Sequence, residues 1–349
     1  MNNLYIIPTS FLLAAVLTAI FAPLARRAGL LDSPDLRKLH QGEIPLVGGL
    51  AIYLTIAFSL LLSDLSLNSL RGFFAGSVVL VVLGVIDDFH ELSAGKRLIA
   101  QGLAMVLMGA FGGVYLANLG HLFDPDHALM LGVIALPFTV FAGVGIINAY
   151  NMIDGMDGLC ASLALVCFGA VGVVAWAAAD HWTLTLLGVI SAATAGFLLF
   201  NVRLPQTTSF RVFLGDAGST LLGFIVVWTL VRSSQGDDAL FSPATALWFA
   251  AIPLLDTVTL MVRRISRGNS PFQADQEHLH HLLQEAGFGV NQALLIAIGL
   301  SLLAAAAGLT MHFMQVADAI QVVAFFVVGV LYFSISARAW IKLKAPLVA

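Results

Sequence analysis

Two pairs of aspartates lie at the ends of long apolar stretches of this sequence. Asp87 and Asp88 occur in "GVIDDFHE", and Asp154 and Asp157 occur in "NAYNMIDGMDG" together with Asn151. Carboxylates are costly there, because a helix dipole disfavours anions at the C-terminus and acidic groups are rare inside membranes unless function needs them. Mg²⁺ takes one or two such oxygen ligands and completes its shell with water and substrate phosphates. The pattern predicts a cation or phosphoryl-transfer site, with ordinary helix ends and caps as the alternative.

Two further segments could complete such a site. Asp216 in "FLGDAGST" is expected at a helix N-terminus, where free amides suit phosphate, although a simple helix cap is the alternative. The segment "EHLHHLL" follows a group of arginines, and arginine forks grip phosphate at two points. Together they indicate an anionic substrate beside a metal, whereas the spacing does not suit zinc. The arginines are Arg263, Arg264 and Arg267, and the histidines of the segment are His278, His280 and His281.

The composition indicates which elements must position these residues. Hydrophobic residues make up 59% of the 349 positions and charged residues only 10%, against about 25% charged in soluble domains. Apolar stretches of membrane-crossing length recur along the chain, without the alternation of a barrel. We expect an all-α integral membrane protein with about eleven spans. They lie at roughly 4–24, 45–63, 70–89, 98–117, 129–148, 158–179, 183–201, 214–232, 243–262, 291–312 and 319–337.

The basic residues sort onto one side of these spans. Of the 16 lysines and arginines, all but Arg71 and Arg232 fall between the same alternate span ends. By the positive-inside rule that side is cytoplasmic, so the N-terminus is expected outside and the C-terminus inside. The first span is not expected to be a cleaved signal, because Arg26 and Arg27 follow it rather than precede it.

The cysteine content predicts no disulfide. Cys160 and Cys167 are seven residues apart on one expected helix, which places them about 10.5 Å apart along its axis. That separation exceeds the reach of a disulfide, so both are expected to be small apolar core residues.

The ordered motifs "DDFHE", "NAYNMIDGMDG", "FLGDAG" and "HLHHLL" resemble those of the polyprenyl-phosphate N-acetylhexosamine-1-phosphate transferases. The resemblance covers nearly the whole chain. The segments "HLHH" and "NMIDGMDG" look like the WecA/TagO-like branch, whereas the related MraY branch carries a longer histidine run. The resemblance implies a single transmembrane catalytic domain over residues 1–349, with its site on the cytoplasmic loops.

The resemblance also implies a reaction. N-acetylglucosamine 1-phosphate would pass from UDP-GlcNAc to undecaprenyl phosphate, giving undecaprenyl-diphosphoryl-GlcNAc and UMP, the first step of a lipid-linked cell-surface glycan. Another UDP-N-acetylhexosamine, or the UDP-MurNAc-pentapeptide of MraY-type enzymes, is the alternative substrate. The implied cofactor is Mg²⁺, with Mn²⁺ as the alternative, and the implied location is the bacterial cytoplasmic (inner) membrane among its lipids. No nucleic-acid partner is expected, and a homodimer is left open.

The resemblance assigns roles to the candidate residues. Asp216 would bind Mg²⁺ with Asn151 as second ligand, and Asp87 would lie where the lipid phosphate arrives, with Asp88 beside it. A phosphate monoester is already mostly a dianion at neutral pH, because its second pKa is near 6. Asp87 could therefore be either a general base or a positioning residue. The residues implied to contact the nucleotide or its phosphates are Asp154, Asp157, Arg263, Arg264, His278, His280 and His281, with Lys38 and His40 as weaker matches.

Two other classes of protein compete with this interpretation. Secondary transporters also have intramembrane acids and helices broken at glycines. Here the acids gather at one membrane face rather than at mid-bilayer, and no repeated halves are visible. A scaffold without catalysis is the third possibility, and several polar clusters in one plane argue against it.

Overall fold

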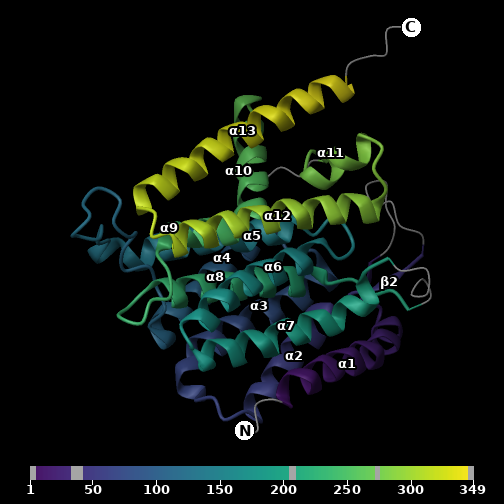
Figure 1. Ribbon diagram of the computed structural model, residues 1–349. Coiled ribbons are helices and arrows are strands. Elements are labelled where there is room, and N and C mark those ends of the chain that lie inside the picture. Colours follow the sequence, from purple (N-terminus) through teal and green to yellow (C-terminus); the bar gives the residue numbers. More distant parts are fainter. Residues whose placement is uncertain (1–4, 33–41, 204–209, 272–275, 345–349) are drawn as a thin grey trace, which may run out of the picture.

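The computed structural model describes residues 5–32, 42–203, 210–271 and 276–344, and these are almost entirely helical (Figure 1). A two-residue antiparallel pair, β1 (Leu31–Asp32) and β2 (Ile44–Pro45), is the small exception. The short 3-10 helices are η2 (Leu67–Leu70) and η3 (Gly132–Ile134). The α-helices are α1 (Ile6–Ala28), α2 (Gly48–Leu61), α3 (Arg71–His90), α4 (Ala94–Gly112), α5 (Ala135–Ile153), α6 (Leu159–Ala177), α7 (His181–Asn201), α8 (Gly215–Ser234), α9 (Pro243–Phe249), α10 (Ala251–Ser266), α11 (Leu279–Glu285), α12 (Val290–Phe313) and α13 (Asp318–Lys344).

The predicted fold class is confirmed. Each of the eleven predicted spans contains a helix, and in the described part of the chain eight helices are long and apolar enough to cross a membrane. The broken pair α9 and α10 would make a ninth span, and α2 is a shorter apolar helix of 14 residues. The chain is therefore a multi-pass, all-helical membrane protein, while the number of spans and their orientation stay predictions.

The structure corrects several predicted boundaries. The span predicted at 243–262 is two helices that meet at 84° around Ala250. Pro253 accounts for the break, because proline lacks the N–H that would bond to the carbonyl of Phe249 and its ring crowds that carbonyl. The span predicted at 98–117 ends earlier, at Gly112, where Gly113 adopts a left-handed φ of 63°. The span predicted at 129–148 continues instead to Ile153, which places Asn151 on a helix.

Helix α8 is the centre of the bundle, in contact with α2, α3, α5 and α6. Its neighbours approach closely because the crossing points are made of small residues. A Cβ atom at Gly84 on α3 would overlap the backbone of Ala217, and one at Gly49 on α2 would overlap that of Gly218. The N-terminus of α8 is thereby held against the C-terminal end of α3.

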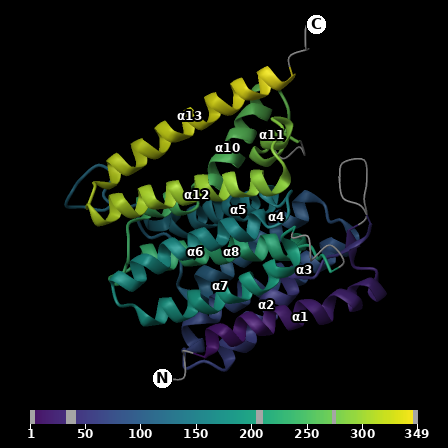
Figure 2. The same ribbon diagram turned by 45° about the vertical axis from the view of Figure 1, so that its right-hand side comes forward.

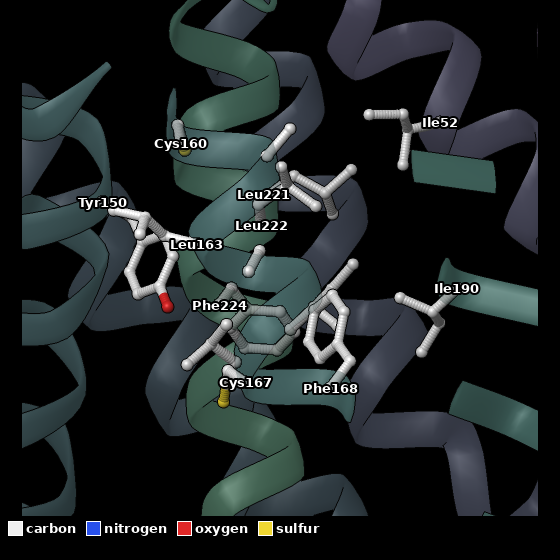
Figure 3. Close-up of a cluster of buried hydrophobic side chains, with 14 of the residues drawn as sticks. Ile52, Tyr150, Cys160, Leu163, Cys167, Phe168, Ile190, Leu221, Leu222 and Phe224 are labelled. Carbon is white, nitrogen blue, oxygen red and sulfur yellow. The ribbon is translucent and has the colours of Figure 1, made fainter. Parts of the chain in front are cut away.

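The core around α8 is apolar, as Figure 3 shows for Leu221, Leu222 and Phe224. Cys160 and Cys167 lie in this core as free, buried thiols, which confirms the expectation of no disulfide. At one edge of the molecule, away from this core, α13 lies beyond α12, with α10 and α11 beside it (Figure 2).

The exposed loops allow the predicted orientation to be tested. A cysteine introduced at Gly95 or Asn269, both exposed at the predicted cytoplasmic end, should be shielded from membrane-impermeant thiol reagents in intact cells. One introduced at Asp237, in an exposed loop at the other end, should react. The two native cysteines are buried and should add little background. Labelling of the Gly95 variant from outside would reverse the orientation.

Candidate active site

Three helix ends bring two carboxylates and a guanidinium together. Asp87 lies in the last turn of α3, Arg97 in the first turns of α4, and Asp216 in the first turn of α8. Nε of Arg97 is 2.6 Å from Oδ2 of Asp87, and its Nη1 is 3.5 Å from Oδ2 of Asp216. The amide of Leu92 donates to Oδ1 of Asp87 at 2.6 Å. Arg97 thus offsets the repulsion between two acids that the helix packing forces close together.

Asp88 holds Asp216 from the other side. The backbone amide of Asp216 donates to Oδ1 of Asp88 at 2.8 Å, and that of Ala217 donates to Oδ2 at 3.4 Å. These amides are free donors at the start of α8, so Asp88 acts as a cap supplied by another helix. Gly215 has a φ of 75°, and a Cβ there would lie 2.7 Å from Oδ2 of Asp88. The side chain of Asp216 does not cap α8, so the alternative that Asp216 is an ordinary helix cap is wrong.

Asn151 completes the arrangement from the last turn of α5. Its Nδ2 donates to Oδ1 of Asp216 at 2.6 Å and to Oγ of Ser219 at 2.9 Å. Beside it lies a cavity of about 20 Å³, which has room for one water molecule or a cation. The polar residues that line this cavity are Asp87, Arg97, Gln101, Asn151, Asp216 and Thr220.

The donor set fits Mg²⁺ better than a metal held by protein alone. Within the described residues no group of three histidine, cysteine or acidic side chains could enclose an ion. Two carboxylates and the side-chain amides of Asn151 and Gln101 border this small cavity, and such oxygen-bearing groups suit Mg²⁺, which retains waters and binds substrate phosphates.

The two aspartates that follow Asn151 lie outside the helix. Because α5 ends at Ile153, a spacing of three residues no longer places them on one face. Asp154 is half-buried, and its burial, with the nearby charge of Asp216 as the next cause, raises the pKa of its carboxyl well above the usual value. Asp157 is buried and forms ion pairs with Arg203 and Arg211, which anchor the loop before α8. Contact of either aspartate with the nucleotide stays a prediction.

Residues 277–283, which carry the three histidines and are called the histidine loop below, pack against the segment that follows Asn151. His280 is buried, and a Cβ at Gly155 would lie 2.5 Å from its Nε2, so Gly155 makes room for the ring. Neither ring nitrogen of His280 has a hydrogen-bond partner within the described residues. Burial lowers its pKa well below the usual value, with the neighbouring His281 and His278 adding to the effect. The three rings lie together, with His280 and His281 only 4.1 Å apart between centroids.

The arginines behind the histidines are engaged with the protein. Nη1 of Arg263 is 3.2 Å from Oε2 of Glu277, and its Nη2 donates to Oγ of Ser336 at 2.9 Å. Nη1 of Arg264 donates to the carbonyl of Pro271 at 2.6 Å. These contacts shape the loop, and a direct role of Arg263 or Arg264 at the substrate phosphates stays a prediction.

The predicted candidates fall into three groups. Asp87, Asp88, Asn151 and Asp216 are brought together, and His280 packs against Gly155, which is close to Asn151 in the chain. Asp157, Arg263 and Arg264 make contacts within the protein. Lys38 and His40 lie outside the described residues.

Sequence reasoning gave no site role to two residues. Arg97 stands ten residues after Asp87, across one short turn, and an arginine just beyond two acids gives no sign by itself that it joins their site. Asp256 is a lone acid in "IPLLDTVTLM", and such an acid in an apolar span is itself a signal of function.

Fold and site define a multi-pass helical membrane protein whose carboxylates, arginine and histidines gather at one end of the bundle. Residues 70–234 match the model of glycosyl transferase family 4. The undecaprenyl-phosphate alpha-N-acetylglucosaminyl 1-phosphate transferase of Escherichia coli (strain K12) is 37% identical over 97% of this chain and 93% of that protein. The enzyme of the same name from Haemophilus influenzae is 37% identical over 95% of this chain and 93% of that protein. The chain belongs to this family of phosphoglycosyl transferases, which confirms the resemblance found in its motifs.

The buried His280 predicts a pH effect on stability. The folded protein keeps this ring neutral, whereas the unfolded chain binds a proton near pH 6.5. Its contribution to stability is therefore complete above about pH 6.5 and is lost as the pH falls toward the lowered pKa. The thermal midpoint of His280→Gln in detergent should fall less than that of wild type between about pH 7.5 and 5.5.

The exposed His181 provides the control, since His181→Gln should keep the wild-type pH dependence. Equal losses in His280→Gln and wild type would contradict the assignment.

Proposed function

We propose that this protein transfers N-acetylglucosamine 1-phosphate from UDP-GlcNAc to undecaprenyl phosphate at the cytoplasmic face of the bacterial inner membrane. The observation that carries the proposal is 37% identity, over nearly the full length, to transferases named for that reaction. The gathering of acids, an arginine and histidines at the ends of membrane helices supports it. A lipid phosphate and a soluble nucleotide can meet only at such a boundary.

The reaction joins two anions. An oxygen of the lipid phosphate forms a bond to the sugar-bearing phosphorus of UDP-GlcNAc, and the bond from that phosphorus to the bridging oxygen breaks. UMP leaves with the electron pair of that bond, and undecaprenyl-diphosphoryl-GlcNAc remains in the membrane. Catalysis of this kind is mainly alignment and neutralisation of charge.

The residues around the cavity suit these two tasks. Asp216 and Asn151 would hold Mg²⁺, and Asp87 borders the same space. When bound, the ion would neutralise charge on the diphosphate oxygens. Asp88 keeps Asp216 in place through the amides of α8. The side chain of Arg97 is 36% exposed, so it is available to an incoming phosphate as well as to the two carboxylates.

The contacts of Asp87 favour positioning over proton abstraction. Its Oδ2 contacts Nε of Arg97 and its Oδ1 accepts from the amide of Leu92, so each oxygen already orients a neighbouring donor. The lipid phosphate is mostly a dianion at neutral pH and has no proton that must be removed. Asp87 is then best suited to orient Arg97 and the arriving phosphate.

The function is tested by release of UMP from purified protein in detergent. UMP should appear from UDP-GlcNAc only when undecaprenyl phosphate is present, and a panel of other UDP-N-acetylhexosamines should react more slowly. The absence of UMP with every sugar nucleotide would overturn the proposal, and a faster reaction with another sugar would change the assigned substrate.

The role of Asp216 is tested by Asp216→Asn at several Mg²⁺ concentrations. A neutral amide is a poorer Mg²⁺ ligand and leaves diphosphate charge exposed, which should cost several kcal/mol. The rate should therefore fall by roughly 100-fold or more. Asp237→Asn, in an exposed loop at the far end of the bundle, is the control. Near-wild-type turnover of a folded Asp216→Asn at low Mg²⁺ would refute the assignment.

A further inference from the structure

Asp256 is a buried acid whose function the reaction scheme above leaves unassigned. It lies on α10, beyond the break in the span, and only 2% of its surface is exposed. A charged side chain is retained in such a place only when its oxygens are fully satisfied. The contacts of Asp256 therefore indicate what it does.

Its carboxylate collects three hydrogen bonds from two other helices. Oδ2 is 2.7 Å from Nδ1 of His278, at the start of α11. Oδ1 accepts from the amide of Leu279 at 3.0 Å and from Oη of Tyr332, on α13, at 2.7 Å. The two views of the molecule show α10, α11 and α13 together at one edge of the bundle (Figures 1 and 2). Asp256 thus joins the histidine loop to both of its supporting helices.

This geometry determines the state of His278. An ionised carboxylate is an acceptor only, so Nδ1 of His278 must carry a proton and donate it to Asp256. The other nitrogen, Nε2, forms no hydrogen bond within the described part of the chain. A partner at Nδ1 that sets the ring's tautomer and direction is how proteins aim the opposite nitrogen of a histidine.

The ring of His278 faces the site through its neighbour. It stacks on His280 with an interplanar angle of 12° and 5.6 Å between centroids. His280 in turn packs against Gly155, between Asn151 and Asp157 in the chain. A rotation of His278 would therefore disturb His280, which packs against residues 151–157.

Helix α13 supports the same loop along one face. Tyr332, Ser336 and Trp340 are spaced by four residues and so share a side of the helix. Tyr332 donates to Asp256, Ser336 accepts from Arg263, and Nε1 of Trp340 donates to the carbonyl of Glu277 at 3.2 Å. Two of these contacts thus reach α10 and one reaches the histidine loop, and Asp256 is the α10 residue that contacts a histidine ring.

We propose that Asp256 is a positioning residue for the transfer reaction: it fixes the tautomer and orientation of His278 so that Nε2 faces the diphosphate of the sugar nucleotide. The proposal rests on the proposed function, since it requires a diphosphate substrate beneath the histidine loop. Asp256 does not touch the substrate and acts through His278.

The test is the kinetics of Asp256→Asn. Asparagine has the same size and can still accept from Leu279 and Tyr332, but its amide presents N–H to Nδ1 and reverses the tautomer. The value of kcat/KM for UDP-GlcNAc should fall at least about tenfold, while KM for undecaprenyl phosphate stays unchanged. Tyr332→Phe, which removes one donor to Asp256, should lower the same kcat/KM by a smaller factor.

Thr257→Val is the matched control on the same helix. Thr257 is buried next to Asp256, and its hydroxyl has no hydrogen-bond partner in the described structure. This variant should keep wild-type kinetics, and thermal midpoints of all variants in one detergent identify any loss of fold. If Asp256→Asn does not fold, Tyr332→Phe decides the question alone.

A double-mutant comparison separates positioning from a general structural role. If Asp256 acts through His278, Asp256→Asn combined with His278→Gln should be no slower than His278→Gln alone. Multiplying effects, or unchanged kcat/KM in folded Asp256→Asn and Tyr332→Phe, would overturn the inference while an active wild type upholds the proposed function. An inactive wild type would overturn both.

Discussion

The close crossing of α3 and α8 is the constraint on which the site depends. It requires Gly84 opposite Ala217, because any side chain at Gly84 would meet the backbone of α8. The crossing places Asp87 and Asp88 beside the first turn of α8, where Asp216 lies. Three carboxylates at one membrane edge repel one another, so the arrangement needs positive charge, which Arg97, the free amides of α8 and, as we propose, a bound cation supply. The positive groups that offset these carboxylates can also neutralise the charge of a phosphate that arrives at this membrane edge.

The break between α9 and α10 is the second feature on which the site depends, because it sets the position of α10. A straight span would continue parallel to its neighbours, whereas the 84° bend carries α10 away from the bundle. Asp256, Arg263 and Arg264 then lie under the histidine loop and α13 rather than among the central helices. The histidine loop is bonded to α10 and α13, and its His280 packs against the segment around Gly155. One proline in the first turn of α10 accounts for this geometry.

Some of the site was predictable from residue types. The pairing of Asp87 with Asp88 at a helix C-terminus, and the place of Asp216 at a helix N-terminus, follow from where the apolar stretches end, and the structure agrees with both. The spacing of Asn151, Asp154 and Asp157 was a weaker guide, because it assumes a helix that in fact stops at Ile153. Asp157 consequently turns to Arg203 and Arg211, a contact across more than 40 residues that no local pattern reveals.

By itself, the sequence determined the class of protein and the approximate position of each long helix, and it indicated candidate residues for binding a phosphate or a metal. These properties are local, since they depend on hydrophobic length and on short motifs. Only the tertiary structure decided which polar groups meet: Arg97 between two acids, Asp88 as the cap of another helix, and Asp256 behind His278. Each of these contacts joins different helices, and helix crossings depend on side-chain packing in three dimensions, which the order of residues along one helix does not specify.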